Sequence, residues 1–536
     1  MICSIFFSFL GAFSVYSGVH IAEENGVAIP GSPFANDVAA IQAAVNRAAD
    51  GDVIQLKAGP GGVQFDFSLG QRRVRLYANN PTSGSSPAAV VPPPSSVGGK
   101  SLTFIGIPSN GVDKPVLYRG NQFFEIDMGA SPGGMNGENT QHDIVFDNLH
   151  FAEAGAITAA ERLLSSRLSA FIFLRRVRSF ILRNCLFTHT NYQQDLRDNL
   201  IEDFQTRVLH LDKQGFVLQS AVPGGIANTV IVSKLLLIED NEVDLCTSCL
   251  PSDVAPRNGQ LYGFNLRRSG PNAKVIARNN NIKNISGSGL LSIDNWGDVN
   301  FYDNYIESTY WQHNRDDLGT GRFYRGGSPT SGFHLEHLDG FMTANPNNYG
   351  SLSADRNIIN SHLLDANGVA IARLENGGGD QKVIKLTGNV ISTKNGHFSI
   401  ELFGFNNVYV GHNYLQGSML SPLMIGRPDF LIDPSITPHP FSTVGGSYVG
   451  NNLTRAAYVD AAVIFSISAT NNSIVGGGVH FNDNNVLFYC TPAPCGNTLS
   501  GYTASGGVGQ VISNSLKAVG ESQPNYHSEN YDQEVE

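Results

Sequence analysis

An asparagine placed two residues before a branched aliphatic residue recurs through the second half of the chain. The copies begin at Asn280, Asn304, Asn357, Asn389, Asn413, Asn451, Asn472 and Asn497. The step is 24 residues from Asn280 to Asn304 and again from Asn389 to Asn413, and it stretches to 53 residues from Asn304 to Asn357. A near-constant step that is sometimes lengthened is typical of a solenoid whose turns carry insertions on one face.

The residues between the copies predict strands rather than helix pairs. Short runs at 299–302, 383–386 and 408–410 are rich in β-branched and aromatic residues and alternate in polarity. The asparagine suits a turn that needs a left-handed backbone, and stacked copies can hydrogen-bond one another in a ladder. The alternative is that asparagine recurs only because it is a good turn residue. The recurring spacing favours the stacked β-solenoid.

One amphipathic helix is predicted near the amino terminus, over residues 36–49. Asn36 or Asp37 can cap it, and Asp50 and Gly51 stop it. Its apolar stripe consists of Val38, Ile41, Val45 and Ala48. The first strand is expected at 53–56. A helix at this place would cover the open end of the solenoid core.

The run of residues 36–45, followed by Gly51 to Leu56 and Gly59, resembles the amino-terminal cap of the pectin-lyase-like right-handed parallel β-helix superfamily. The later asparagine repeats resemble its coils, and the resemblance covers residues 30 to 515. It implies an all-β, single-stranded right-handed parallel β-helix with an amino-terminal capping helix. The expected division is a segment at 1–30, the β-helix at 31–515 and a polar tail at 516–536. That superfamily includes lyases, hydrolases, epimerases, adhesins and phage tailspikes, so the fold does not settle the reaction.

Composition restricts partners and compartment. A net charge of −11 argues against a nucleic-acid partner, because phosphate binding needs a dominating basic surface. No stretch approaches the roughly 20 apolar residues of a membrane-spanning helix. Residues 1–16 are apolar without a preceding Lys or Arg, so they are either a secretory signal or a buried amino terminus. We expect an extracellular protein, secreted or exposed on a cell or virion surface.

Two other features allow more than one interpretation. Cys246 with Cys249, and Cys490 with Cys495, are close pairs for which loop disulfides are the first interpretation and buried free thiols the second. A helix is expected at 158–168. The arginines of 175–183 alternate with apolar residues, which favours a solvated outer face over a site for an anionic substrate.

The 53-residue step between Asn304 and Asn357 holds most candidate catalytic groups, and insertions of this size in a regular solenoid are usually functional. In a strand that continued through 333–341, His337 and Asp339 would share one face with Leu338 turned inward. This His-x-Asp-Gly pattern resembles one found in several β-helix polysaccharide-modifying enzymes. Mannuronan C5-epimerases carry a related Asp-Pro-His-Asp motif, but Leu335 and Glu336 precede His337 here. The alternative is a surface turn.

The following repeats supply neighbours. Aligning Gly368 with Gly396 stacks Arg373 against Glu401 and Val369 against His397. Arg373 would then lie one coil above the strand of His337, where it can bind a carboxylate in bidentate fashion. An ordinary surface ion pair between Arg373 and Glu401 is the alternative. Asp294 would extend the same stripe one coil earlier, and Trp311, beside Tyr310, offers an aromatic platform for a sugar ring.

These residues predict an enzyme that removes the C5 proton of an acidic polysaccharide, as a lyase or an epimerase. His337 would be the base, Asp339 would hold its tautomer, Arg373 would neutralise the substrate carboxylate, and Tyr324 would be the acid. The expected substrate-binding residues are Asp294, Trp311, Arg322, Arg325, His397 and Glu401. A glycoside hydrolase and a non-catalytic glycan-binding solenoid, including a homotrimer, are the alternatives. No cofactor or metal is predicted, and the sequence leaves a need for Ca²⁺ open.

Overall fold

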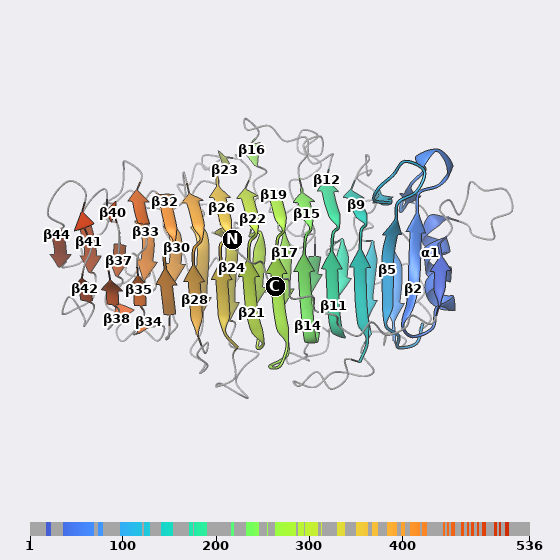
Figure 1. The fold of residues 1–536 in the computed structure, drawn as a ribbon, viewed down its shortest axis with the longest axis horizontal. Helices are drawn as coiled ribbons and strands as arrows, with labels where there is room; N and C mark the ends of the chain where they lie inside the picture. The colour runs from blue at the N-terminus through green and yellow to red at the C-terminus, as the bar shows by residue number, and fades with distance from the viewer. Residues whose placement is uncertain are drawn as a thin grey trace, which may run out of the picture.

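The chain winds as a parallel β-helix of stacked coils, with an α-helix at its amino-terminal end and a short 3-10 helix at Pro60–Gly62 (Figure 1). The computed structural model describes residues 18–22, 36–68, 73–78, 97–119, 123–128, 141–153, 171–174, 176–189, 216–218, 232–245, 254–255, 263–267, 269–285, 288–293, 295–308, 312–313, 330–337, 350–362, 367–373, 383–393, 398–402, 408–418, 421–425, 443–444, 447–449, 452–455, 463–465, 469–470, 473–475, 480–481, 485–488, 498–500, 503–504 and 510–513.

Three long sheets form the walls, and the coils up to β37 pass from sheet A to sheet B to sheet C. In the last two coils, a separate small sheet takes the place of sheet B. Sheet A consists of β1 (Val19–Ile21), β2 (Asp52–Lys57), β5 (Leu102–Ile107), β8 (Asp143–Asp147), β11 (Val177–Arg183), β14 (Val232–Glu239), β18 (Lys274–Arg278), β21 (Asp298–Tyr302), β25 (Leu352–Asp355), β28 (Ile384–Thr387), β31 (Val408–Gly411), β35 (Ser447–Val449), β39 (Ser473–Val475) and β42 (Thr498–Ser500). Sheet B consists of β3 (Phe65–Asp66), β6 (Val116–Tyr118), β9 (His150–Glu153), β12 (Leu186–His189), β15 (Glu242–Asp244), β19 (Asn281–Ile285), β22 (Tyr305–Ser308), β26 (Ile358–Ser361), β29 (Val390–Thr393), β32 (Tyr414–Ser418) and β36 (Asn452–Arg455).

Sheet C consists of β4 (Val74–Tyr77), β7 (Phe124–Asp127), β10 (Ile172–Leu174), β13 (Phe216–Leu218), β17 (Phe264–Arg267), β20 (Leu290–Ile293), β24 (Thr330–His337), β27 (Asn367–Arg373), β30 (Phe398–Leu402), β33 (Ser421–Ile425), β37 (Val463–Phe465), β41 (Asn485–Phe488) and β44 (Gln510–Ser513). Three small sheets pair β16 (Val254–Ala255) with β23 (Gln312–His313), β34 (Thr443–Val444) with β38 (Ala469–Thr470), and β40 (His480–Phe481) with β43 (Thr503–Ala504). The strands pair in parallel in every one of these sheets. The predicted right-handed parallel β-helix is confirmed.

The capping helix α1 (Asp37–Arg47) lies where the sequence predicts it. The Asn36 side chain accepts a hydrogen bond from the backbone of Ala39, and the stripe of Val38, Ile41, Val45 and Ala48 is buried. Lys100 covers the other end of the helix, because its buried ammonium donates to the carbonyls of Val45 and Ala48. One prediction is wrong here: the strand at 53–56 is not the first, since β1 precedes α1 and pairs with β2.

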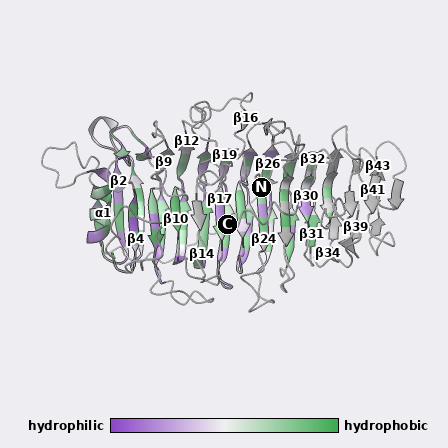
Figure 2. Ribbon diagram, turned by 180° about the vertical axis from the view of Figure 1, so that it is seen from behind, coloured by the Kyte–Doolittle hydropathy of each residue, from purple (hydrophilic) through white to green (hydrophobic). Residues whose placement is uncertain are grey.

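Alternation along the strands sorts side chains to the interior or to the outer surface. The inward side chains form one continuous hydrophobic core along the stack, and phenylalanines dominate its first coils. In Figure 2 hydrophobic and hydrophilic segments alternate along the described strands. Strand β5 shows this period of two, with Leu102 and Phe104 buried and their neighbours partly exposed. The 158–168 segment and the paired cysteines lie outside the described residues. None of the helices in the described part of the chain is long and apolar enough to cross a membrane.

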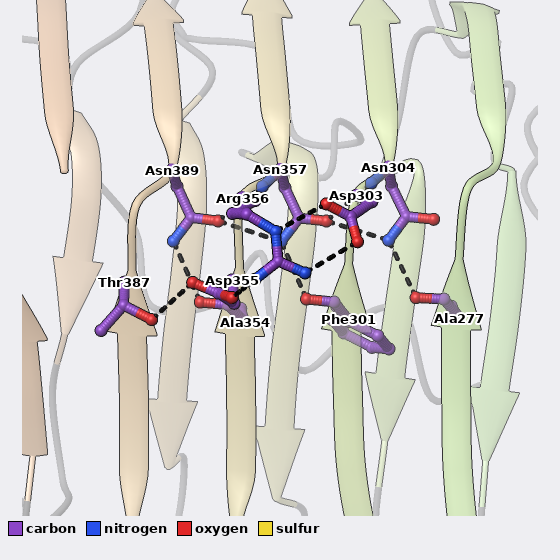
Figure 3. Close-up of polar contacts among 10 residues, drawn as sticks. All are labelled: Ala277, Phe301, Asp303, Asn304, Ala354, Asp355, Arg356, Asn357, Thr387 and Asn389. Carbon is purple, nitrogen blue, oxygen red and sulfur yellow. Dashed lines mark hydrogen bonds and ion pairs between the residues drawn. The ribbon is translucent and has the colours of Figure 1, made fainter. Parts of the chain in front are cut away.

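The corner between sheets A and B holds the predicted ladder (Figure 3). From Asn241 to Asn389, each asparagine amide donates to the side-chain oxygen of the next asparagine and to a strand carbonyl, as Asn304 does to Asn357 and Ala277, both at 2.9 Å. The ladder runs through Asn241, Asn280, Asn304, Asn357, Asn389 and Asn413. The left-handed backbone lies one residue earlier than expected, for example at Asp303, with φ 57. Asn451, Asn472 and Asn497 lie outside the described residues.

Candidate functional site: the outer row of sheet C

One row of residues on the outer face of sheet C runs the length of the molecule. Register places Arg75, Glu125, Phe173, Val217, Asn265, Leu291, His334, Ala370, Glu401, Met424, Ile464, Leu487 and Ile512 side by side on successive strands. Where the side chains of the row are described, these positions alternate with core residues such as Phe333 and Leu335, so these side chains point away from the core. We call this set the outer row.

Burial distinguishes the outer row from an ordinary solvent-facing surface. Wherever its side chains are described they are at least 95% buried, and Asn265, His334 and Glu401 are 0% exposed. All five residues of β30 are buried, on both faces of the strand. Because an outward residue on a single-walled sheet otherwise faces water, other parts of the molecule must pack over this face. Buried ionisable groups of this kind are rare unless they are partnered or functional.

His334 and Glu401 are the described ionisable groups in the central part of the row. They lie two rungs apart with Ala370 between them, so their backbones are separated by about 9–10 Å. The outer faces of β24 and β30 therefore carry a buried imidazole and a buried carboxylate.

His337 and Arg373 are register partners at the ends of β24 and β27. The sequence placed Arg373 one coil above the strand of His337, and the register confirms this placement of the two backbones. β24 ends at His337, so the expected continuation of the strand through Leu338 and Asp339 falls outside the described residues.

The predicted stacking of Arg373 on Glu401 is wrong. Glu401 pairs with Ala370, and Val369 pairs with Ile400 rather than with His397. Nor can Glu401 form a surface ion pair, because it is fully buried. The alignment failed because it matched Gly368 with Gly396, whereas the register brings Ser399 beside Gly368 and so shifts the pairing by three residues.

A column of glycines at the corner before sheet C explains this register. In four coils a glycine comes directly before the first inward-pointing core residue of the sheet C strand, at Gly263, Gly289, Gly332 and Gly368. A β-carbon on any of these glycines would collide with the next coil. On Gly332 it would lie 2.3 Å from the carbonyl oxygen of Gly368, and on Gly368 it would lie 2.8 Å from that of Ser399. Glycine therefore fixes the close approach of β17, β20, β24 and β27. This repeated glycine could have given the register of β17, β20, β24 and β27, but not that of β30, where Ser399 takes the place of the glycine.

Other predicted residues are not placed by the structure. Asp294, Trp311, Arg322, Tyr324, Arg325, Asp339 and His397 lie outside the described residues. Arg178 and Arg183 lie on the solvated outer face that the sequence favoured, where Arg178 binds Asp143 and Arg183 binds Asp147. Arg176 differs, because it is mostly buried and binds the buried Asp127. Arg175 lies outside the described residues. No group of three or more His, Cys, Asp or Glu side chains in the described residues could hold a metal ion.

Comparisons with known proteins give distant likenesses to solved β-helix structures. No protein-family profile matches the chain, and no curated protein matches it. The A-modules of the Azotobacter vinelandii mannuronan C-5 epimerases AlgE6 and AlgE4 are 13% and 12% identical, with TM-scores of 0.38 and 0.34. These matches cover 91% and 90% of this chain and 99% and 94% of those modules.

Bacteriophage CBA120 tailspike protein 3 is 11% identical, with a TM-score of 0.36. That match covers 92% of this chain but only 62% of the tailspike chain, so this chain spans less than two thirds of the tailspike's length. At such identities and scores, none of these likenesses bears on activity or substrate.

Proposed function

We propose that the protein acts on an acidic polysaccharide that binds beside the ends of β24 and β27, and that it works outside the cell or on an exposed surface. The observation that carries the proposal is the register pair of His337 and Arg373, which brings a candidate base and a candidate carboxylate-binding residue to adjacent strands.

The proposed reaction is removal of the proton at C5 of a uronate. Arg373 would neutralise the adjacent carboxylate and so acidify that proton, because a guanidinium binds a carboxylate in bidentate fashion. His337 would accept the proton, with Asp339 orienting the imidazole and Tyr324 acting as the acid. Protonation of the leaving oxygen, with cleavage of the glycosidic bond, gives an unsaturated uronate. Return of a proton to C5 from the opposite face gives the epimer.

The pairing of His337 with Arg373 supports this order of roles, since adjacent rungs are about 4.8 Å apart. A carboxylate bound at one rung would present its neighbouring carbon to the other. His334 and Glu401 lie beneath the same face and would hold their neighbours in position rather than contact the reacting atoms.

The test is incubation with alginate, pectate and a neutral glucan, read by ultraviolet absorbance for the unsaturated uronate, by proton NMR for epimers and by a reducing-end assay. A lyase or an epimerase acts on the acidic polymers alone, and His337→Ala abolishes the product. The matched control is His412→Asn, which changes an exposed histidine before the ladder residue Asn413. Reducing ends without unsaturation would indicate a hydrolase. Retention of the glycan without product would indicate a binding protein, whose assembly as a homotrimer light scattering would reveal. No interaction with any acidic polymer would refute the proposal.

A further inference from the structure

One row of residues on the outer face of sheet B is both apolar and exposed. It lies on four successive strands, β22, β26, β29 and β32, and consists of Tyr305, Ile358, Val390 and Tyr414. Ile358, Val390 and Tyr414 are 43%, 40% and 38% exposed, and Tyr305 is partly exposed. The described side chains of the outer row of sheet C are instead at least 95% buried. We call the four residues the sheet B ridge.

The surface around the ridge is uncharged. The strands β26, β29 and β32 contain no Asp, Glu, Lys or Arg, although the whole chain has 46 acidic and 35 basic residues. Arg356, in the turn before β26, is bound by Asp303 through two contacts of 2.8 Å. A charged ligand would therefore find no counter-charge on these strands, and an uncharged ligand would lose none.

A row of polar side chains runs beside the ridge. Two residues further along the same strands lie Asn360, Ser392 and Gln416, which are partly exposed and are register partners of one another. Residues two apart in a strand point to the same face, so both rows point outward. In the part of the chain that the structure describes, neither the Ser392 hydroxyl nor the Gln416 side-chain amide has a hydrogen-bond partner. These groups are available to a ligand that contacts the ridge.

The ridge is too narrow for a stable contact with a second copy of the chain. It is one side chain wide, and three strand spacings of about 4.8 Å give it a length of about 14 Å. A stable interface buries about 800 Å² on each partner, which is several times what such a strip offers. An extended oligosaccharide fits better, because the strand spacing is close to the length of one sugar, so the ridge spans about three sugars.

We infer that the sheet B ridge binds an uncharged, extended oligosaccharide whose chain runs along the stack of coils. A sugar ring has an apolar face of C–H groups and a rim of hydroxyls. The ridge contacts the C–H face, and Asn360, Ser392 and Gln416 exchange hydrogen bonds with the hydroxyls, so that a few polar groups orient a ligand held on an apolar surface. This site lies on a different sheet from His337 and Arg373, so the inference goes beyond the proposed function and does not depend on its reaction.

The test is isothermal titration calorimetry of the wild-type protein with four hexasaccharides. Cellohexaose and mannohexaose are extended and uncharged, maltohexaose is coiled and uncharged, and hexagalacturonate is charged. We expect one of the extended, uncharged probes to bind, and to bind more tightly than maltohexaose. Tyr414→Ala should weaken that binding by about tenfold, because an exposed aromatic contact is lost, and Val390→Ser should weaken it less.

Matched controls make the same two changes away from the ridge. Tyr409→Ala alters a partly exposed tyrosine on the outer face of sheet A, and Val383→Ser alters a valine that is 44% exposed. Neither control should change the affinity for the extended, uncharged probe. Since Tyr414 and Val390 are exposed, both ridge variants should keep a cooperative melting transition, and Val390→Ser decides if Tyr414→Ala does not fold.

The outcomes separate this inference from the proposed function. If the wild-type protein binds none of the uncharged probes, or if both ridge variants bind them as wild type does, the ridge is not a glycan site. Loss of binding together with loss of the folded state in both variants assigns the ridge a structural role and refutes the inference. So does a dimer in light scattering that Tyr414→Ala converts to a monomer without changing glycan affinity. None of these results bears on turnover of acidic polymers, whose absence in the wild-type protein would refute the proposed function alone.

Discussion

The corner between sheets A and B and the outer row of sheet C run along the same coils, yet they are built in opposite ways. At the corner, six successive coils place the same asparagine in the same set of hydrogen bonds. In the outer row, five successive rungs carry Asn265, Leu291, His334, Ala370 and Glu401. Both regions are buried, and only one of them repeats.

The difference follows from what each region must satisfy. A coil corner presents the same backbone donors and acceptors at every rung, so the same side chain can hydrogen-bond to them in every coil. The outer row has no repeated backbone requirement, because the sheet already pairs those groups. The buried polar residues of the outer row therefore differ from rung to rung. Under the proposed function, they support the ligand site beside them.

The largest effect is expected at the ladder. In Asn304→Ala, four side-chain hydrogen bonds disappear: two that Asn304 donates, to Ala277 and Asn357, and two that it accepts from Asn280. Their loss inside a buried stack should lower the free energy of unfolding by about 4 kcal/mol. Urea denaturation measures this, and activity per folded molecule should not change. A loss below about 1 kcal/mol would mean that asparagine serves only as a turn residue.

The next effect is expected beside the outer row. There a substitution should lower activity and leave stability nearly unchanged, which is the opposite of the effect at the ladder. Arg373→Ala should lower kcat/KM on the acidic substrate by about 100-fold, because the substrate carboxylate loses its neutralising partner. The free energy of unfolding should stay within about 0.5 kcal/mol of wild type, because the proposal places the Arg373 side chain against the substrate rather than in the core. Arg373→Lys should restore only part of the rate, since lysine lacks the bidentate fork. Steady-state kinetics measures kcat/KM, and urea denaturation of the same preparations measures the free energy of unfolding. Equal losses of rate and stability would erase the distinction between the two regions.

The two regions also differ in how far the sequence alone could predict them. The repeat Asn-x-Ile revealed the corner because every coil imposes the same chemistry there, and Asn280 to Asn413 were all placed correctly. Asn241 was missed although it fits the same pattern, with the branched aliphatic Val243 two residues later. The burial of His334 and Glu401 was not predictable, because it depends on what packs over the sheet. The three-residue error at Glu401 arose because Ser399 takes the place that glycine holds in the preceding coils.

A third prediction concerns the pH dependence of stability on the ladder side of the molecule. Burial, with a smaller contribution from the nearby Lys114, lowers the pKa of His150 to about 4. Its ring nitrogen lies 2.7 Å from the Thr188 hydroxyl. Because the unfolded pKa is about 6.5, this stabilisation is complete above that pH and is lost as pH falls towards 4. The loss should reach at most about 3 kcal/mol. His150→Gln should flatten the unfolding free energy between pH 6.5 and 4. An unchanged pH profile in the variant would assign that dependence to other groups.

The smallest effect is expected where the ladder begins. Cys185 occupies the ladder position one coil before Asn241, and its backbone N–H already donates to the Asn241 side-chain oxygen at 3.0 Å. Its thiol is buried, and desolvation raises the thiol pKa to about 12, so it stays a neutral apolar group. Cys185→Asn would extend the ladder by one rung, with the new amide donating to Asn241 and to the carbonyl of Phe146, the counterpart of Leu182 one coil earlier.

The unfolding free energy of Cys185→Asn should therefore lie within about 1 kcal/mol of wild type, whereas Asn304→Ala loses several times as much. Cys185→Asp is the matched control: it has the same shape but no amide donor, and its buried carboxylate should be strongly destabilising. Urea denaturation of the three variants side by side measures the contrast. If Cys185→Asn were as damaging as Cys185→Asp, the corner would not be interchangeable from coil to coil. Repetition would then be no guide to which buried polar residues serve the fold and which serve a ligand.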